Sequence, residues 1–368
     1  QVEHPVTELV SGLDIVEMMF VVASGGELSI RQEDISLNGW AIESRVYAED
    51  PLRDFLPSTG RLTNYVEPTG EGVRVDSGVY EGGEVSIYYD PMIAKLVTFG
   101  ENRDQAIASM SEALDNYYIR GVNHNISFLN SLMNHPRFIA GNLTTNFISE
   151  EYPDGFTVDP MSPDDLMMMI AVVVLANQFR LEREAKLSGQ LSERQYRPPH
   201  DWVVAAAGAS TPASIKTLEK GGHVVKVSGV DHHITTDWKL GDPIFSAKIQ
   251  DRFICVQIET NVNSYVLYYR GAKISAEVLS KRASELSVHM LHKEPEDLSK
   301  FLLSPMPGLL VSISVSEGDS VKVGDELVVV EAMKMENSLR AVQNGVVSAV
   351  RSAVGDSLAV DQVILEFE

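Results

Sequence analysis

Lys334 stands between Met333 and Met335 in a short segment, 331–337, that joins two runs of alternating apolar residues. A lysine is a long flexible stem ending in an amine, so at an exposed turn an enzyme can modify it and it can carry a tethered group. The simplest interpretation is a solvated turn lysine beside hydrophobic filler. Two methionines at an exposed tip, however, leave apolar surface in water unless another molecule recognises them. The pattern therefore favours a modified lysine.

The segment around Lys334 divides a repeated sequence. Shifting the C-terminal region by 37 residues aligns Gly308 with Gly345, and it aligns Gly318-Asp319-Ser320 with Gly355-Asp356-Ser357. Both halves read as short alternating strands joined by Gly-Asp turns. We expect residues 301–368 to form a small β-sandwich with quasi-twofold symmetry, with the lysine hairpin protruding from one end.

Residues 332–335 resemble the Ala-Met-Lys-Met signature of biotin carboxyl carrier domains, and residues 305–308 resemble the motif that opens such domains. The resemblance implies that biotin is attached covalently to Lys334, that Met333 and Met335 belong to the same site, and that a biotin protein ligase is a partner. Lipoyl domains also carry a hairpin lysine, but they lack the Met-Lys-Met frame.

The N-terminal segment Gln1-Val2-Glu3-His4-Pro5 is densely polar. Taken alone, Glu3 and His4 are weak candidates, because a surface glutamate is usually just solvated. The segment is nevertheless similar to the bicarbonate-binding loop of biotin carboxylases, which have an ATP-grasp fold. The similarity continues through residues 48–51, 55–58 and 89–92 and on to Lys95.

This second resemblance implies roles for individual residues. Glu3 would be the base that acts on bicarbonate, and Gln1 and the backbone of Val2 would hold that bicarbonate. Arg45 would supply the positive charge that stabilises a developing ureido oxyanion. As a separate hypothesis, not implied by the resemblance, Asp90 orients Arg45. No metal ligand is expected in this chain, although the full-length subunit would use ATP, Mg and bicarbonate.

The family's ATP site lies upstream of Gln1, and the sequence contains no Gly-rich phosphate loop. We therefore expect a fragment of a longer ligase subunit that does not carboxylate biotin by itself.

The middle of the chain predicts a helix surrounded by strands. Ser162 is a plausible N-cap before Pro163, and residues 166–176 are apolar on every side, so that this helix must be enclosed. Strands are predicted at 202–206, 224–227, 245–249, 253–259, 265–270, 273–279 and 286–291, with a hairpin tip at 261–263. We expect a barrel or half-barrel wrapped around the helix.

Residues 150–156 and 298–303 resemble parts of the linking domain of propionyl-CoA carboxylase α subunits, which docks onto a carboxyltransferase β subunit. Together these patterns predict a multidomain α+β protein. Residues 1–151 would be the C-terminal part of a biotin carboxylase domain, with helices near 13–23, 102–118 and 125–135. Residues 152–300 would be the linking domain, ending in a polar linker, and 301–368 the biotinyl domain.

Three interpretations of function follow. The first is the biotin-carrying α subunit of an acyl-CoA carboxylase, with propionyl-CoA as substrate and methylcrotonyl-CoA or another acyl-CoA as the alternative. The second is a carrier and docking fragment without catalysis of its own. The third, a purely structural β protein, explains neither the repeat nor the first fifty residues.

The composition limits which partners and which cellular compartment we expect. The net charge of −22 repels phosphate backbones, which argues against nucleic acid as a partner. The longest apolar run is too short to cross a bilayer, so no membrane association is expected. Cys255 is the single cysteine and reads as a buried strand residue, which excludes an internal disulfide and suits a reducing compartment. We expect a bacterial cytoplasm, or a mitochondrial matrix in a eukaryote.

Overall fold

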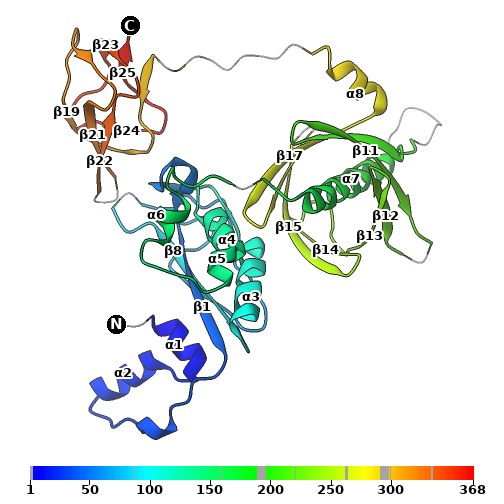
Figure 1. The fold of residues 1–368 in the computed structure, drawn as a ribbon, viewed down its shortest axis with the longest axis horizontal. Helices are drawn as coiled ribbons and strands as arrows, with labels where there is room; N and C mark the ends of the chain where they lie inside the picture. Colours follow the sequence, from blue (N-terminus) through cyan, green and yellow to red (C-terminus); the bar gives the residue numbers. More distant parts are fainter. Residues whose placement is uncertain are drawn as a thin grey trace.

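The computed structural model describes residues 3–86, 88–158, 160–188, 196–219, 221–261, 264–290, 298, 300–332 and 335–368. Three regions follow one another along the chain: a mixed α/β region, a barrel with a helix inside it, and a small β-sandwich (Figure 1). The predicted fold class is confirmed.

The first region is built on an antiparallel sheet in the order β1-β8-β6. Its strands are β1 (Trp40–Tyr47), β6 (Val73–Ser77) and β8 (Met92–Gly100). Short two-stranded pairs join β2 (Glu49–Asp50) to β3 (Leu56–Pro57), β4 (Gly60–Arg61) to β7 (Glu84–Val85), and β5 (Asn64–Val66) to β9 (Tyr118–Arg120). The single-turn 3-10 helices are η1 (Gln32–Asp34) and η2 (Pro51–Arg53).

The first region also contains α-helices, some of which pack on this sheet. They are α1 (His4–Ser11), α2 (Ile15–Ala23), α3 (Arg103–Asn116), α4 (Ile126–Asn134), α5 (Pro136–Ile139) and α6 (Phe147–Glu151). The apolar face of α3 packs on β1 and β8, with Met110 and Leu114 fully buried. The helices predicted near 102–118 and 125–135 are confirmed within two residues at each end.

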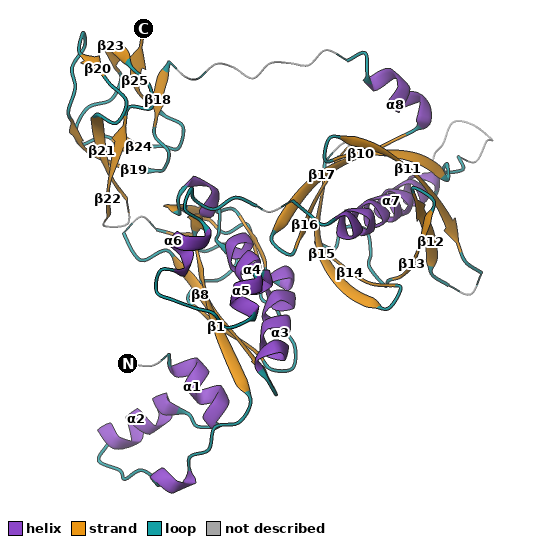
Figure 2. Ribbon diagram, in the orientation of Figure 1, coloured by secondary structure: helices purple, strands orange, loops and turns teal. Residues whose placement is uncertain are grey.

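The second region is a closed barrel around α7 (Pro163–Ala185) (Figure 2). Among the described residues, its strands are β10 (Asp201–Ala206), β11 (Ala209–Thr217), β12 (His223–Val227), β13 (Val230–Thr235), β14 (Ile244–Ile249), β15 (Arg252–Thr260), β16 (Ser264–Tyr269) and β17 (Ala272–Leu279). The hydroxyl of Ser162 accepts a hydrogen bond from the backbone N–H of Asp165 at 3.2 Å, so the predicted N-cap is confirmed.

The strand predictions for this region need correction, because one predicted strand is wrong and two observed strands were missed. The strand predicted at 286–291 is wrong, because Leu286 lies in the helix α8 (Lys281–Ser287), which Ser280 caps. Residues 291–297 and 299, which include most of the predicted linker, lie outside the described residues. Strands β11 and β13 were not predicted, since their sequences mix small, polar and charged residues.

A buried polar seam joins the first region to the barrel. The side-chain amide of Gln257 on β15 donates to the carbonyl oxygens of Asp115 and Tyr117, both at 3.0 Å. The backbone N–H of Arg270 donates to Asp115 Oδ1 at 2.8 Å. Gly271 lies against α4 so closely that an added Cβ would stand 2.6 Å from the carbonyl oxygen of Ser127. These contacts fix the barrel against α3 and α4.

The third region consists of two four-stranded sheets, β18-β25-β23-β20 and β22-β21-β19-β24, in the described part of the chain. The strands are β18 (Phe301–Leu303), β19 (Gly308–Ile313), β20 (Ser320–Val321), β21 (Glu326–Ala332), β22 (Met335–Arg340), β23 (Gly345–Val350), β24 (Ser357–Leu358) and β25 (Val363–Phe367). The 37-residue shift carries β19 onto β23 and β20 onto β24, so each sheet repeats the order of the other. The predicted symmetric sandwich is confirmed.

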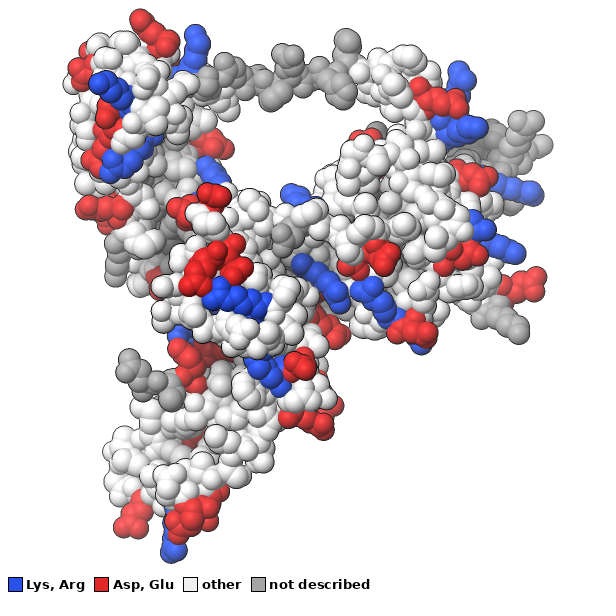
Figure 3. Space-filling view, viewed as in Figure 1, with Lys and Arg blue, Asp and Glu red and all other residues white. Residues whose placement is uncertain are grey.

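One helix of the first region stands apart from every core. Helix α2 has no buried residue, and its apolar side chains face outward, with Phe20 73% and Met19 65% exposed. The surface over this helix carries few charges in the face shown by Figure 3. It follows Asp14, whose carboxylate caps it, and ends at Ala23, as predicted for the helix near 13–23. No helix among the described residues is long and apolar enough to cross a membrane.

Candidate active site

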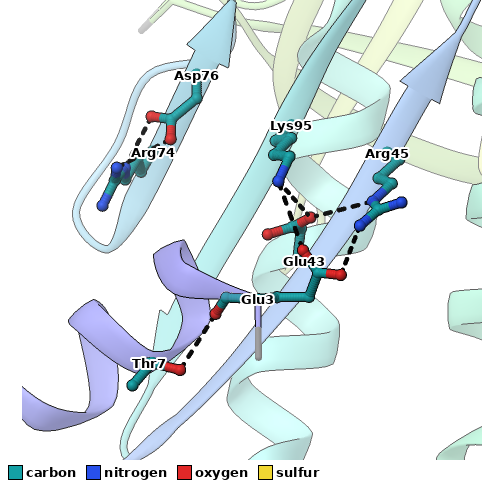
Figure 4. A network of polar contacts seen from close by, with 7 residues as sticks. All are labelled: Glu3, Thr7, Glu43, Arg45, Arg74, Asp76 and Lys95. Carbon is teal, nitrogen blue, oxygen red and sulfur yellow. Dashed lines mark hydrogen bonds and ion pairs between the residues drawn. The ribbon is translucent and has the colours of Figure 1, made fainter. Parts of the chain in front are cut away.

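Four charged side chains meet where α1 approaches the first sheet (Figure 4). Arg45 Nη2 donates to Glu3 Oε1 at 2.5 Å, and Lys95 Nζ lies 3.5 Å from Glu3 Oε2. Glu43 Oε1 lies 3.5 Å from Arg45 Nε and 3.6 Å from Lys95 Nζ. Two carboxylates and two cations therefore form one compact group.

The ladder between β1 and β8 places three of these residues on one face. Successive strand residues alternate between faces, so Glu43 and Arg45 project together while Ser44 and Val46 face the core. Lys95 is the register partner of Arg45 on the neighbouring strand. Side chains directly opposite each other in a sheet are close enough to interact.

Helix α1 supplies the fourth residue. Glu3 occupies the N-cap position before Pro5, but its side chain makes no capping hydrogen bond and turns to Arg45 instead. The helix is anchored further along by Glu8, which accepts from Arg74 Nη1 at 2.6 Å. Arg74 is itself held on β6 by two hydrogen bonds to Asp76, at 2.8 and 2.9 Å. This anchor fixes where Glu3 meets the sheet.

The charges perturb one another in the expected directions. Hydrogen bonding to Arg45 is the main cause that lowers the pKa of Glu3, with Lys95 adding to it. The same bond raises the pKa of Arg45, so the guanidinium stays protonated. The Glu3 and Arg45 side chains are 49% and 44% exposed. An ion pair this open to solvent contributes little to stability, so a small anion could rearrange it at little cost.

The structure brings together some of the predicted site residues and not others. Glu3 and Arg45 are in direct contact. Asp90 was expected to orient Arg45, but its carboxylate accepts from the backbone N–H of Met92 at 2.9 Å. Arg45 instead contacts Glu3, Glu43 and Tyr47. Gln1 and Val2 lie outside the described residues.

Sequence reasoning did not assign a role to Glu43 or Lys95. The alternation of β1 could have placed Glu43 beside Arg45, but only the observed strand register shows that Lys95 joins them. Among the described residues, no group of three or more His, Cys, Asp and Glu is arranged to hold a metal ion.

The predicted carrier site lies in the third region. Strands β21 and β22 pair antiparallel as far as Ala332 opposite Met335, and the two residues between them, Met333 and Lys334, lie outside the described residues. Met335 is 48% exposed. Gly308 approaches β21 closely, because an added Cβ would stand 2.6 Å from the carbonyl oxygen of Glu331.

The base of this hairpin also contacts Met306, a second buried residue of the 305–308 motif. Met306 is fully buried, and the side-chain amide of Asn337 on β22 contacts its sulfur at 3.6 Å. Residues 305–308 therefore brace the two strands that lead to Met333 and Lys334. Such a base fits a rigid support for a modified lysine.

Comparison with known families finds three domain matches along the chain. Residues 43–150 match the biotin carboxylase C-terminal domain, residues 169–293 match the propionyl-coenzyme A carboxylase BT domain, and residues 301–367 match the domain of biotin-requiring enzymes. In the order and kind of these three domains, the chain is similar to the α subunits of biotin-dependent acyl-CoA carboxylases.

The chain is also similar to individual proteins. The propionyl-CoA carboxylase alpha chain of Ruegeria pomeroyi is 43% identical over 388 residues, which cover 100% of this chain and 57% of that protein. The mitochondrial methylcrotonoyl-CoA carboxylase subunit alpha of Dictyostelium discoideum is 31% identical, covering 95% of this chain and 52% of that one. The biotin carboxylase subunit of pyruvate carboxylase, a solved structure, is 45% identical with a TM-score of 0.42, covering 44% of this chain and 35% of that chain. The chain thus spans about half the length of these curated relatives.

Proposed function

We propose that this chain is part of the biotin-carrying α subunit of a propionyl-CoA carboxylase, a ligase. The observation that carries the proposal is the order of the three matched domains along one chain that is 43% identical, over its whole length, to a propionyl-CoA carboxylase alpha chain. In this proposal the biotin carboxylase part spans 1–151, the linking domain 152–300 and the biotinyl domain 301–368.

The proposed carrier residue is Lys334, with Met333 and Met335 as the frame that a biotin protein ligase recognises. Biotin, once attached, supplies the ureido nitrogen that accepts a carboxyl group. The braced base formed by Met306, Gly308 and Asn337 supports this assignment, since it holds the hairpin strands in one geometry.

The proposed chemistry of the first region uses the charged group at α1. Glu3 would remove a proton from bicarbonate, which requires its ionised form, and its lowered pKa favours that form at neutral pH. Arg45 would supply a fixed positive charge where negative charge develops. Gln1 and Val2 are proposed to hold the bicarbonate. ATP and Mg would be bound by the part of the subunit that precedes this chain in its longer relatives.

The barrel is proposed to dock the carboxyltransferase β subunit, in line with the match to the BT domain. Acyl selection would then belong to that partner. Propionyl-CoA is proposed over methylcrotonyl-CoA because the relative that acts on the former is 43% identical and the one named for the latter is 31% identical. The proposed compartment is a bacterial cytoplasm, or a mitochondrial matrix in a eukaryote.

The carrier assignment is tested by co-expressing the chain with a biotin protein ligase and measuring intact mass and streptavidin capture. We expect capture of the parent and none of Lys334→Arg, which keeps the charge but cannot be biotinylated. Capture of the variant would place biotin elsewhere, and capture of neither would leave a docking fragment as the better interpretation.

The acyl substrate is tested with the complete α subunit reconstituted with its β subunit. We expect faster carboxylation of propionyl-CoA than of methylcrotonyl-CoA. A preference for the branched enoyl ester would reverse the substrate assignment while leaving the carrier result intact.

A further inference from the structure

Glu43 is the most enclosed member of the charged group. Its side chain is 5% exposed, compared with 21% for Lys95 and 49% for Glu3. Its Oε2 atom is buried and has no hydrogen-bond partner among the described residues. Burying a carboxylate is costly unless counter-charges and hydrogen bonds compensate for the lost water. Glu43 therefore occupies a position that stability alone does not favour.

The contacts of Glu43 are too long to be explained as a strong structural ion pair. Its Oε1 lies 3.5 Å from Arg45 Nε and 3.6 Å from Lys95 Nζ, beyond the range of a good charge-assisted hydrogen bond. The same oxygen nevertheless faces both cations at once. Arg45 then presents Nη2 to Glu3, and Lys95 presents the same ammonium to the other oxygen of Glu3.

We propose that Glu43 is a positioning residue that holds Arg45 and Lys95 on either side of the Glu3 carboxylate, and that Lys95 is a second cation of the bicarbonate site. The inference rests on the proposed function of Glu3 as a base. Glu43 precedes Arg45 by two residues on the same face of β1 and contacts its guanidinium. Lys95 lies opposite Arg45 on β8 and contacts the same Glu43 oxygen. An anion that displaces Glu3 from these cations would meet two positive charges already in place.

The electrostatic consequence of this arrangement has a definite sign. Two cations favour ionised Glu3, whereas the buried negative charge of Glu43 opposes it. The other titratable or charged groups near this cluster are Glu8, which is paired with Arg74, Asp76, which also binds Arg74, His4, which follows Glu3 on α1, and Tyr47 on β1, which contacts Arg45. As long as both cations stay in place, removing the charge of Glu43 should make Glu3 a weaker base, whereas removing Lys95 should make it a stronger one.

The test uses the complete subunit and follows kcat/KM for carboxylation of free biotin against pH. The acidic limb of that profile reports the base of the free enzyme. Glu43→Gln keeps the shape and removes the charge, so we expect the limb to move down by roughly half a pH unit, and Lys95→Met should move it up by a similar amount. Glu43→Asp, which keeps the charge, should leave the limb near that of the parent while lowering kcat.

A matched control and a second readout complete the design. Glu84→Gln removes an exposed carboxylate of β7 and should change neither the limb nor kcat. In the chain itself, the side-chain carboxyl signal of Glu3, assigned with Glu3→Gln in ¹³C-glutamate-labelled protein, should titrate at lower pH in Glu43→Gln and at higher pH in Lys95→Met. Shifts in the same direction, or none, overturn the inference. Failure of the complete parent subunit to carboxylate biotin would instead overturn the proposed function.

Discussion

Two apolar helices of this protein have opposite surroundings. In helix α7 the apolar stretch Met168 to Ala176 is buried inside the barrel. Helix α2 has no buried residue, although its sequence is Ile-Val-Glu-Met-Met-Phe-Val-Val-Ala. A helix that is apolar on every side is stable only when other groups cover it. The barrel provides that cover for α7. Nothing among the described residues covers α2. Its sequence is therefore typical of a covered helix, but the described residues do not provide the cover.

The difference shows what apolar patterning can and cannot specify. Both sequences predict a helix, and both helices form. For α7 the pattern also predicts that the helix is enclosed, but the enclosing elements lie far away in sequence, since β10 to β17 follow α7 over more than seventy residues. Burial, unlike helicity, belongs to the tertiary structure and is decided by segments that the local pattern does not contain.

The largest expected effect comes from placing a charge in each helix. Val173→Asp buries a carboxylate at a fully enclosed position and should destabilise the barrel by about 4 kcal/mol or more, enough to unfold it in many backgrounds. Val22→Asp, at a position 53% exposed, should change stability by no more than about 0.5 kcal/mol. Denaturant unfolding followed by circular dichroism measures both. Equal losses would show that α2 is covered in solution.

A second test extends the comparison from apolar groups to a buried ionisable group. Asp115, beneath the barrel seam, has its pKa raised to about 8 by burial, although hydrogen bonds from Arg270 and Asn130 oppose the shift. Its ordinary pKa is 3.8, so between about pH 4 and pH 8 folding must take up a proton at this site. This contribution to stability is complete below pH 4 and is lost as the pH rises through about 8.

Asp115→Asn should therefore lose less thermal stability than the parent between pH 5 and pH 9, while keeping an oxygen that accepts the same two hydrogen bonds. Melting temperatures over this range give the slope. Asp251→Asn, at a fully exposed turn, is the control and should follow the parent. A variant slope as steep as that of the parent would mean that Asp115 stays ionised in the folded seam.

The smallest expected effect compares the two N-caps. Ser162→Ala removes the hydroxyl that caps α7 and should lower the stability of the barrel by about 1 kcal/mol. Asp14→Ala removes the equivalent cap of α2, where the carboxylate accepts from the N–H of Glu17 at 2.7 Å. Because α2 buries nothing, its loss should appear as faster hydrogen exchange of the α2 amides without a change in global unfolding. A lower global stability for Asp14→Ala would contradict this reasoning.

Local signals in the sequence predicted much of the fold. The N-cap at Ser162, the apolar helix after it and the 37-residue repeat all depend on neighbouring residues or on a fixed spacing, and all are present. The strand predicted at 286–291 failed because alternation in a short segment is also compatible with a helix, and Ser280 supplies the cap that decides between them. Strand β11 contains Pro212 and many small residues, so no strand propensity marked it.

The candidate site was predicted from a family resemblance and not from local patterns in the sequence. The resemblance to biotin carboxylases singled out Glu3 and Arg45, which are 42 residues apart and in contact. It gave no reason to add Glu43 and Lys95, because that grouping depends on the register of β1 against β8. Register is set by the whole sheet and its connections, which no short motif encodes.

The internal symmetry of the third region has a mechanical consequence. The chain enters this domain through β18 and leaves it through β25, which pair with each other at one end, whereas β21 passes to β22 at the opposite end (Figure 1). The point where β18 enters the sandwich and the described base of the β21–β22 hairpin therefore lie at opposite ends of the domain. A small rotation of the domain about its β18 end would move the hairpin base along the widest arc that the domain allows, so the length of the sandwich itself would add to the distance that the hairpin base can cover.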